Sequence, residues 1–290
     1  MKYYGRLFAG EFIGTFLMVF FGVGAAAVAT LLGTMTGNYQ VGMVWGITIA
    51  IAIYVCRHLS GAHFNPAVSF AMVVAKRMPV RELPSYLLGQ FTGALLAGFS
   101  LIALFDDSIV GWLKTNGSTF LEASSASSVW VEQFPNNVNA FVPTWDAFLA
   151  EFFCVVLLIV VIFSLTSSDN TGRPNNHLAP LFIGLTVTII VGTIGPLTNA
   201  CLNPARDFGP RIAGFFAGWT TIAFYPDMWL VYYLAPLAGG IAGALLYTYC
   251  IAPLHHRCIN DSSIPCDPDG HLCQNPNCDR EERAQFEQSA

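Results

Sequence analysis

The sequence has few charged residues: lysine, arginine, aspartate and glutamate together make up 11% of its 290 positions. Soluble domains carry about 25%, so this scarcity excludes an ordinary soluble globular protein. The net charge is only −5, and no run of basic residues suggests a nucleic-acid partner. Because 54% of the residues are hydrophobic, we expect a protein that lies in a lipid bilayer.

The sequence also lacks a catalytic constellation, and we expect a protein that is not an enzyme. Four of the eight cysteines lie in the C-terminal segment, but only Cys273 and Cys278 have a C-x₂₋₄-C spacing, and the second such pair of a structural zinc site is missing. A plain flexible tail is therefore favoured over metal binding. The residues that a zinc site there would use are His255, Cys258, Cys266, His271, Cys273 and Cys278.

Six apolar segments are long enough to span a bilayer, which takes roughly 20 residues. Two more, 65–76 and 203–218, are too short to cross and begin with Asn-Pro; such lengths favour re-entrant half-helices. The predicted fold is an all-α membrane protein of six transmembrane helices plus two half-helices. The spans are expected at 6–32, 39–59, 84–105, 145–166, 177–195 and 229–251.

Lysine and arginine are distributed unevenly between the two sides of this topology, which predicts its orientation. With both termini cytoplasmic, the cytoplasmic side holds Lys2, Arg6, Arg57, Lys76, Arg77, Arg81, Arg173 and Arg257. The other side holds only Lys114, in the predicted loop 106–144, besides the arginines of the second half-helix. We expect a multi-pass protein of the cell membrane, either a plasma membrane or a bacterial inner membrane. Asn116 begins a glycosylation pattern on the outer face, a pattern common by chance.

The two halves of the chain repeat each other. EFIGTF (11–16) matches EFFCVV (151–156), and FNPAVSF (64–70) matches LNPARDF (202–208), with 54 and 52 residues between each Glu and its Asn. Each half has three spans, an odd number, so the halves must insert in opposite orientations, which predicts an inverted 3+3 repeat with its site at the repeat interface. We expect a channel domain at 1–253, with repeats at about 1–106 and 145–253, and a disordered cytoplasmic tail at 254–290.

Asparagine and proline are well suited to the first positions of a helix. The half-helices should therefore start at these residues, with their partly positive ends facing each other near the bilayer centre. If the asparagine amides face a lumen, they would donate hydrogen bonds to a permeating oxygen; the alternative is that they only cap buried helices. The central constriction is expected at Asn65, Pro66, Ala67, Asn203, Pro204 and Ala205.

The backbone that leads into each half-helix must be non-helical, and irregular backbone at membrane depth is tolerated where it lines a wet cavity. Its carbonyls would form a ladder of acceptors. Glu11 and Glu151 are interpreted as scaffold residues that accept N–H bonds from these loops, and the alternative is a pair of ion-coupling carboxylates, as in transporters. The carbonyls expected to line a pore belong to Gly61, Ala62, His63, Phe64, Asn199, Ala200 and Cys201.

GAHFNPAVSFA and GPLTNACLNPARDFGP resemble the two signature loops of the major intrinsic protein family, the aquaporins and glycerol facilitators. The resemblance covers about 1–253 and implies a homotetramer of independent pores without a cofactor. It also implies a four-residue selectivity filter on the extracellular side, at Trp45, Val191, Ala200 and Arg206.

The filter residues are similar to those of the glycerol facilitator branch in some positions and differ in others. Trp45 is typical of facilitators, as are Asp207, Arg211, Pro236 and Leu237, and Val191 is not the histidine of water-selective members. Facilitators typically have glycine where Val191 stands and an aromatic residue where Ala200 stands. These departures favour a somewhat wide filter that admits small polyols and urea-sized neutral solutes.

A polyol has a hydroxyl edge and a C–H edge. Trp45 offers an apolar face to the C–H edge, and the Arg206 guanidinium donates fixed N–H bonds to the hydroxyl edge; Asp207 is expected to brace the loop. The predicted function is a passive channel for glycerol, similar small neutral solutes and water, which excludes ions and protons. Alternatives are a mainly water-conducting pore, an ion-coupled solute transporter and, from a third class, a junctional protein with a vestigial pore.

Overall fold

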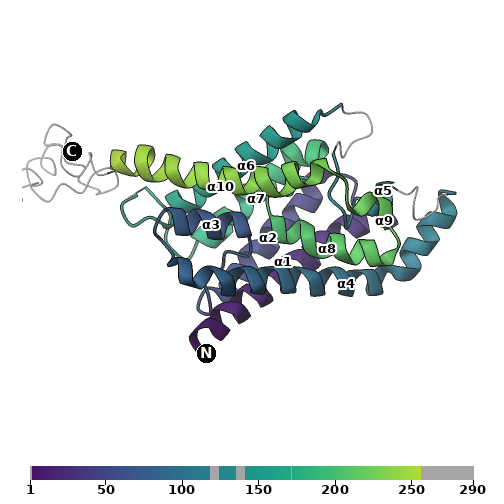
Figure 1. Ribbon diagram of the computed structural model, residues 1–290, viewed down its shortest axis with the longest axis horizontal. Coiled ribbons are helices and arrows are strands. Elements are labelled where there is room, and N and C mark those ends of the chain that lie inside the picture. The colour runs from purple at the N-terminus through teal and green to yellow at the C-terminus, as the bar shows by residue number, and fades with distance from the viewer. Residues whose placement is uncertain (1, 118–123, 135–140, 171, 256–290) are drawn as a thin grey trace, which may run out of the picture.

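The computed structural model describes residues 2–117, 124–134, 141–170 and 172–255. Within them, six helices are long and apolar enough to cross a membrane, which confirms the predicted number of spans (Figure 1). They are α1 (Lys2–Leu32), α2 (Asn38–Cys56), α4 (Leu83–Thr115), α6 (Thr144–Thr166), α7 (Ala179–Thr198) and a last helix (Trp229–His255), which comprises η2 (Trp229–Leu234), α10 (Ala235–Leu246) and η3 (Tyr247–Ile251).

The two half-helices are also present: α3 (Pro66–Val74) has 9 residues and α8 (Pro204–Ala217) has 14. At 1.5 Å per residue neither spans the roughly 30 Å of a hydrocarbon core. The short helices η1 (Val80–Glu82), α5 (Ser124–Ser127) and α9 (Thr220–Ala223) complete the described elements, among which there is no strand. The all-α fold with six spans and two half-helices is confirmed, and the chain is a multi-pass membrane protein.

One predicted boundary was wrong by about three turns. The third span was expected to end at residue 105, followed by a loop from 106 to 144, but α4 continues to Thr115. Ile109 and Leu113, one turn apart, remain buried along the same face as Leu101, so packing continues past the charged pair that follows Phe105. The length of an apolar segment indicates only how much of a helix lies in the hydrocarbon core. The helix itself continues for as long as one of its faces is buried against other segments.

Equivalent helices of the two halves have equivalent packing partners. In the first half α1 packs against α2 and α4, and in the second half α6 packs against α7 and α10. The half-helices cross over: α3 lies on α10, and α8 lies on α4. α2 and α7, which occupy equivalent places, pack on each other. This exchange of partners is what an inverted repeat requires.

Two glycines let the paired helices approach closely at equivalent places. A Cβ atom at Gly93 of α4 would collide with the carbonyl oxygen of Phe12 on α1, and one at Gly239 of α10 would collide with that of Phe152 on α6. Phe12 and Phe152 are the second residues of the two repeated EF motifs. The close approach brings the motif glutamates inward, toward the half-helices.

The outward faces of the long helices are apolar as well. Leu88, Leu157 and Ile189 are 61%, 59% and 62% exposed, as expected for side chains that contact lipid tails. Along the bundle, α5 and α9 lie together at one end, to the right in Figure 1, and we call this the α5–α9 end. The last helix ends at the opposite end of the molecule.

Candidate permeation pathway

A cavity of about 330 Å³ is lined by residues from both halves of the chain. Toward the α5–α9 end it is lined by Arg206 of α8, and toward the opposite end by Arg57 and Asn176. The tips of both half-helices line its middle part, where Asn65 and Asn203 both contribute. The cavity therefore connects the three regions that a permeation pathway would need.

Each half-helix begins at an asparagine that caps it. The Asn65 side-chain oxygen accepts from the backbone N–H of Ala67 at 2.8 Å, and that of Asn203 accepts from Ala205 and Arg206 at 3.0 and 3.2 Å. The first helical residue is proline in both, as predicted for the helix starts. The remaining N–H groups of each first turn leave a partial positive charge at the tips.

The two asparagine amides also bond across the repeat interface. Asn65 Nδ2 donates to the Leu202 carbonyl at 2.9 Å, and Asn203 Nδ2 donates to the Phe64 carbonyl at 2.8 Å. An amide nitrogen carries two hydrogens, and one of them holds the opposing loop in each case. These residues thus cap helices and line the cavity at once, where capping alone was the simpler interpretation.

The lead-in loops have a strained backbone. Positive φ angles occur at Ala62 (55°) and Phe64 (53°) in the first loop, and at Ala200 (51°) and Leu202 (58°) in the second. The left-handed conformation costs a residue with a side chain roughly 1–2 kcal/mol. Such strain persists only where the surroundings over-determine it.

The two buried glutamates supply that constraint. Glu11 accepts from the backbone N–H groups of His63 and Phe64 at 3.0 and 2.7 Å, and from the Ser60 and Gln90 side chains. Both carboxylates are fully buried, at 0% exposure.

Glu151 accepts from the backbone N–H groups of Cys201 and Leu202 at 2.9 and 2.7 Å, and from the Thr198 hydroxyl at 2.6 Å. Each glutamate therefore holds the two residues that precede the capping asparagine. Neither glutamate lines the cavity. This arrangement supports the scaffold interpretation over an ion-coupling role.

The four residues expected to form a filter all line the cavity. Trp45 of α2, Val191 of α7, Ala200 and Arg206 come from four separate segments. The Arg206 guanidinium carbon lies 4.7 Å from the centre of a Trp45 ring, a cation–π distance that joins the apolar and the polar wall. This contact places an apolar ring beside a hydrogen-bond donor on the wall of the cavity.

The model of the family described as "Major intrinsic protein" matches residues 2–247. The chain belongs to the major intrinsic protein family. Among curated members, it is 36% identical to the glycerol uptake facilitator protein of Pseudomonas aeruginosa over 236 residues, covering 81% of this chain and 84% of that one. It is 34% identical to the glycerol uptake facilitator protein of Escherichia coli over 257 residues, 89% of both chains.

Two further comparisons place it within the family. The propanediol uptake facilitator PduF of Citrobacter freundii is 35% identical over 249 residues, 83% of this chain and 90% of the relative. The X-ray structure of the aquaglyceroporin from Plasmodium falciparum superimposes with a TM-score of 0.76 at 26% identity, covering 87% of this chain and 99% of that chain. The aquaporin-like fold expected from the two signature loops is thereby confirmed.

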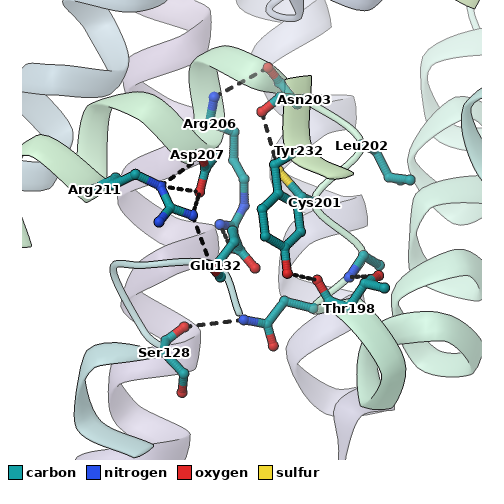
Figure 2. Close-up of polar contacts among 12 residues, drawn as sticks. Ser128, Glu132, Thr198, Cys201, Leu202, Asn203, Arg206, Asp207, Arg211 and Tyr232 are labelled. Atoms are coloured by element: carbon teal, nitrogen blue, oxygen red, sulfur yellow. Dashed lines mark hydrogen bonds and ion pairs between the residues drawn. The ribbon is translucent and has the colours of Figure 1, made fainter. Parts of the chain in front are cut away.

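One residue that contacts the cavity lining was not predicted from the sequence. Glu132, in the segment between α5 and α6, is 0% exposed, and its carboxylate forms an ion pair with the Arg206 guanidinium (Figure 2). The 106–144 region was treated as a polar loop. The signal that could have located it is the apolar run Val129–Val131 just before the glutamate, all of which is buried.

Asp207 lies behind the filter and does not line the cavity. Arg211 Nε donates to both its carboxylate oxygens at 3.0 and 2.9 Å, and Arg211 Nη2 reaches one of them at 2.6 Å. The same guanidinium donates to the carbonyls of Ala223 at 2.6 Å and Glu132 at 2.8 Å. Asp207 thus braces the surrounding loops through Arg211 (Figure 2).

The residues of the predicted zinc site and of the glycosylation pattern lie away from the cavity or outside the described residues. Of the six tail residues considered for zinc, only His255 is described, at the end of the last helix. Cys258, Cys266, His271, Cys273 and Cys278 lie outside the described residues, so the tail stays a prediction. Asn116 follows α4 and is exposed, and its side chain donates to the Trp112 carbonyl at 2.8 Å.

Proposed function

We propose that this protein is a passive channel that conducts glycerol, similar small neutral solutes and water down their gradients. The observation that carries the proposal is that one and the same cavity is lined by the proposed filter residues, by the two half-helix tips and by Arg57. The relatives named glycerol and propanediol uptake facilitators support short polyols as the substrate class. The chain is a channel and not an enzyme.

The walls of the cavity match the two edges of a polyol. Trp45, Ile49 and Val187 present apolar surface on one side. The strained lead-in loops present carbonyl acceptors, and Arg206 presents N–H donors, on the other. A solute whose hydroxyl groups lie along one edge can exchange its water for these partners without leaving buried donors unpaired.

The filter of this channel is proposed to be wide for a facilitator. Val191 and Ala200 are both small, and Trp45 is the only aromatic residue among the four proposed filter positions. The loss of an aromatic wall at Ala200 should admit solutes somewhat bulkier than glycerol. Small polyols and urea-sized molecules are the expected range.

Ions and protons are proposed to be excluded at the centre and at the filter. The tips of α3 and α8 place two partly positive helix ends beside Asn65 and Asn203, which opposes cations. The passage between Trp45 and Arg206 is proposed to be too narrow for a hydrated ion. An ion-coupled transporter would need a carboxylate that faces the lumen, whereas both buried glutamates hold loop N–H groups instead.

Assembly and orientation complete the proposal. We propose a homotetramer with one pore in each subunit, in a plasma membrane or bacterial inner membrane, with both termini cytoplasmic. The α5–α9 end would then face the outside. Chemical crosslinking in membranes and accessibility of a tag at each terminus test these two statements.

Flux measurements in proteoliposomes test the function. Stopped-flow swelling should show glycerol and urea entering at rates well above empty vesicles, with erythritol slower, while an imposed proton gradient persists. The transporter alternative expects uptake that collapses with an ion gradient and solute accumulation against a gradient. A channel with water flux but no glycerol flux would contradict the proposal and favour the water-conducting alternative.

A further inference from the structure

The ion pair between Glu132 and Arg206 joins two segments that are far apart in the chain. Arg206 belongs to the first turn of α8 and is 6% exposed, and Glu132 lies between α5 and α6 with no exposed surface. The contact joins the Arg206 Nη1 group to Glu132 Oε1. Among the described residues, neither Glu132 carboxylate oxygen has a hydrogen-bond partner, so this ion pair is what compensates the buried charge.

We propose that Glu132 is the positioning residue of the filter: its carboxylate fixes the orientation of the Arg206 guanidinium and cancels its charge, so that solute discrimination is a property of the pair. The proposal rests on the filter role proposed above for Arg206. Glu132 does not line the cavity, whereas Arg206 does. Glu132 must therefore act on the solute through Arg206 and not by direct contact.

The carboxylate is presented from a segment that is itself held firmly. The backbone carbonyl of Glu132 accepts from Arg211 Nη2 at 2.8 Å and from the Tyr225 hydroxyl at 3.2 Å. Two residues earlier, Trp130 stacks on Trp219 with ring centres 5.4 Å apart. A side chain on such a fixed backbone can impose its position on the arginine, which a mobile loop could not do.

The charges around the filter balance because of this residue. Arg206 and Arg211 are both buried, as are Asp207 and Glu132. Arg211 is already paired with Asp207, so Glu132 alone balances Arg206. Without it, a buried guanidinium would be left uncompensated, and the wet lumen is where it could find new partners.

The pair also decides which donors the solute meets. Arginine has five N–H donors in a rigid plane, and the Nη1 group is turned to Glu132, which does not line the cavity. Released from this contact, the guanidinium would lean into the passage, narrow it and bind hydroxyl groups more strongly. The effect should grow with solute size, so glycerol should be slowed more than water.

The test is the ratio of glycerol to water permeability in proteoliposomes, which does not depend on how much channel is inserted. Glu132→Gln should lower this ratio about twofold or more, the lower limit for residues coupled in one ion pair. Glu132→Asp, which keeps the charge, should restore most of the ratio. The neighbouring Gln133→Ala serves as the matched control and should leave the ratio unchanged.

Arg206→Ala separates this inference from the proposal beneath it. If Glu132 acts only through the arginine, the double variant Arg206→Ala/Glu132→Ala should have the same ratio as Arg206→Ala alone. This comparison also decides the matter should Glu132→Gln yield no folded channel, since the double variant leaves no unpaired charge. A further shift in the double variant would overturn the inference.

The outcomes are distinguishable from one another. If Arg206→Ala leaves the ratio and the polyol series unchanged, the proposed filter itself is wrong. If Arg206→Ala changes them but Glu132→Gln does not, the filter stands and only the role of Glu132 is overturned. An equal shift in Gln133→Ala would show a general disturbance of the segment and would also overturn it.

Discussion

The two half-helix loops of this channel share their first residues and then diverge. Both have a buried glutamate that holds two backbone N–H groups, an asparagine cap and a proline start. Three residues after the asparagine, the first loop has Val68 where the second has Arg206. Both side chains line the cavity. The residues that the two loops share therefore form the centre of the pore. The position at which they differ, Val68 against Arg206, places a hydrogen-bond donor on one side of that centre only.

The residue that follows shows the same divergence. Ser69 occupies the place of Asp207, and its hydroxyl accepts from Gln90 at 2.9 Å, within the network around Glu11. Asp207 instead pairs with Arg211, which reaches the segment of Glu132. In the first half, these polar residues bond only within the scaffold around Glu11. In the second half, they also bond to the separate segment that contains Glu132, which contacts Arg206.

The largest effect is expected from replacing a buried glutamate, which both halves have. Glu151→Ala would leave the N–H groups of Cys201 and Leu202 buried without an acceptor, at about 1–3 kcal/mol each, beside a strained backbone. Glycerol flux per folded channel should fall by roughly tenfold or more, and the thermal unfolding temperature should drop. Glu11→Ala should behave alike. Near-wild-type flux in either variant would contradict the scaffold role.

The next effect tests the divergence directly. Arg206→Ala should remove the donors of the filter and widen it, so that the ratio of glycerol to erythritol permeability falls severalfold. Val68→Ala, at the equivalent place in the first half, should leave that ratio unchanged. Stopped-flow swelling across a polyol series measures both. Equal changes in the two variants would mean that selectivity is not confined to one end.

A smaller change should follow at the apolar wall. Trp45→Ala would remove the surface on which the Arg206 guanidinium rests and the face that a polyol's C–H edge meets. Discrimination by solute size should relax, with erythritol gaining more than glycerol, while Trp45→Phe should retain most of it. An unchanged polyol series in Trp45→Ala would remove this residue from the filter.

The smallest expected effects concern two tyrosines that support the lead-in loops. Tyr86 accepts from the Gly61 N–H at 2.8 Å, and Tyr232 donates to the Thr198 carbonyl at 3.2 Å. Tyr232→Phe should cost about 1–3 kcal/mol of stability, because Thr198 is fully buried and its carbonyl loses this partner. Tyr86→Phe should cost less, about 0.5–1.5 kcal/mol, because Gly61 is exposed and its N–H can bond to water. Neither replacement should change selectivity. Thermal unfolding in detergent measures the difference, and an equal cost would contradict this ordering.

Much of the fold could be predicted because it depends on local patterns. The six spans follow from apolar length, and the half-helix starts follow from Asn-Pro, whose capping chemistry is contained in adjacent residues. The end of α4 could not be predicted in this way, because it depends on which face of residues 106–115 packs against other segments. Hydropathy does not carry that information.

The site was predictable only where the two halves repeat or resemble a known family. The pairing of Glu132 with Arg206 depends on a return of the chain between α5 and α6 that no short pattern specifies. The bonds of Asn65 and Asn203 to each other's loops likewise depend on the meeting of the two halves. Contacts between distant segments are set by the packing of the whole bundle.

The crossed amide bonds have a consequence for how the protein is made. Asn65 must find its acceptor at Leu202, which is 137 residues further along the chain. At roughly 5–20 residues per second, a ribosome needs on the order of ten seconds to synthesise that stretch. The first re-entrant segment therefore has to wait in the translocon or the lipid with an unfinished tip, and biogenesis of the pore is completed only when the second half arrives upside down beside it.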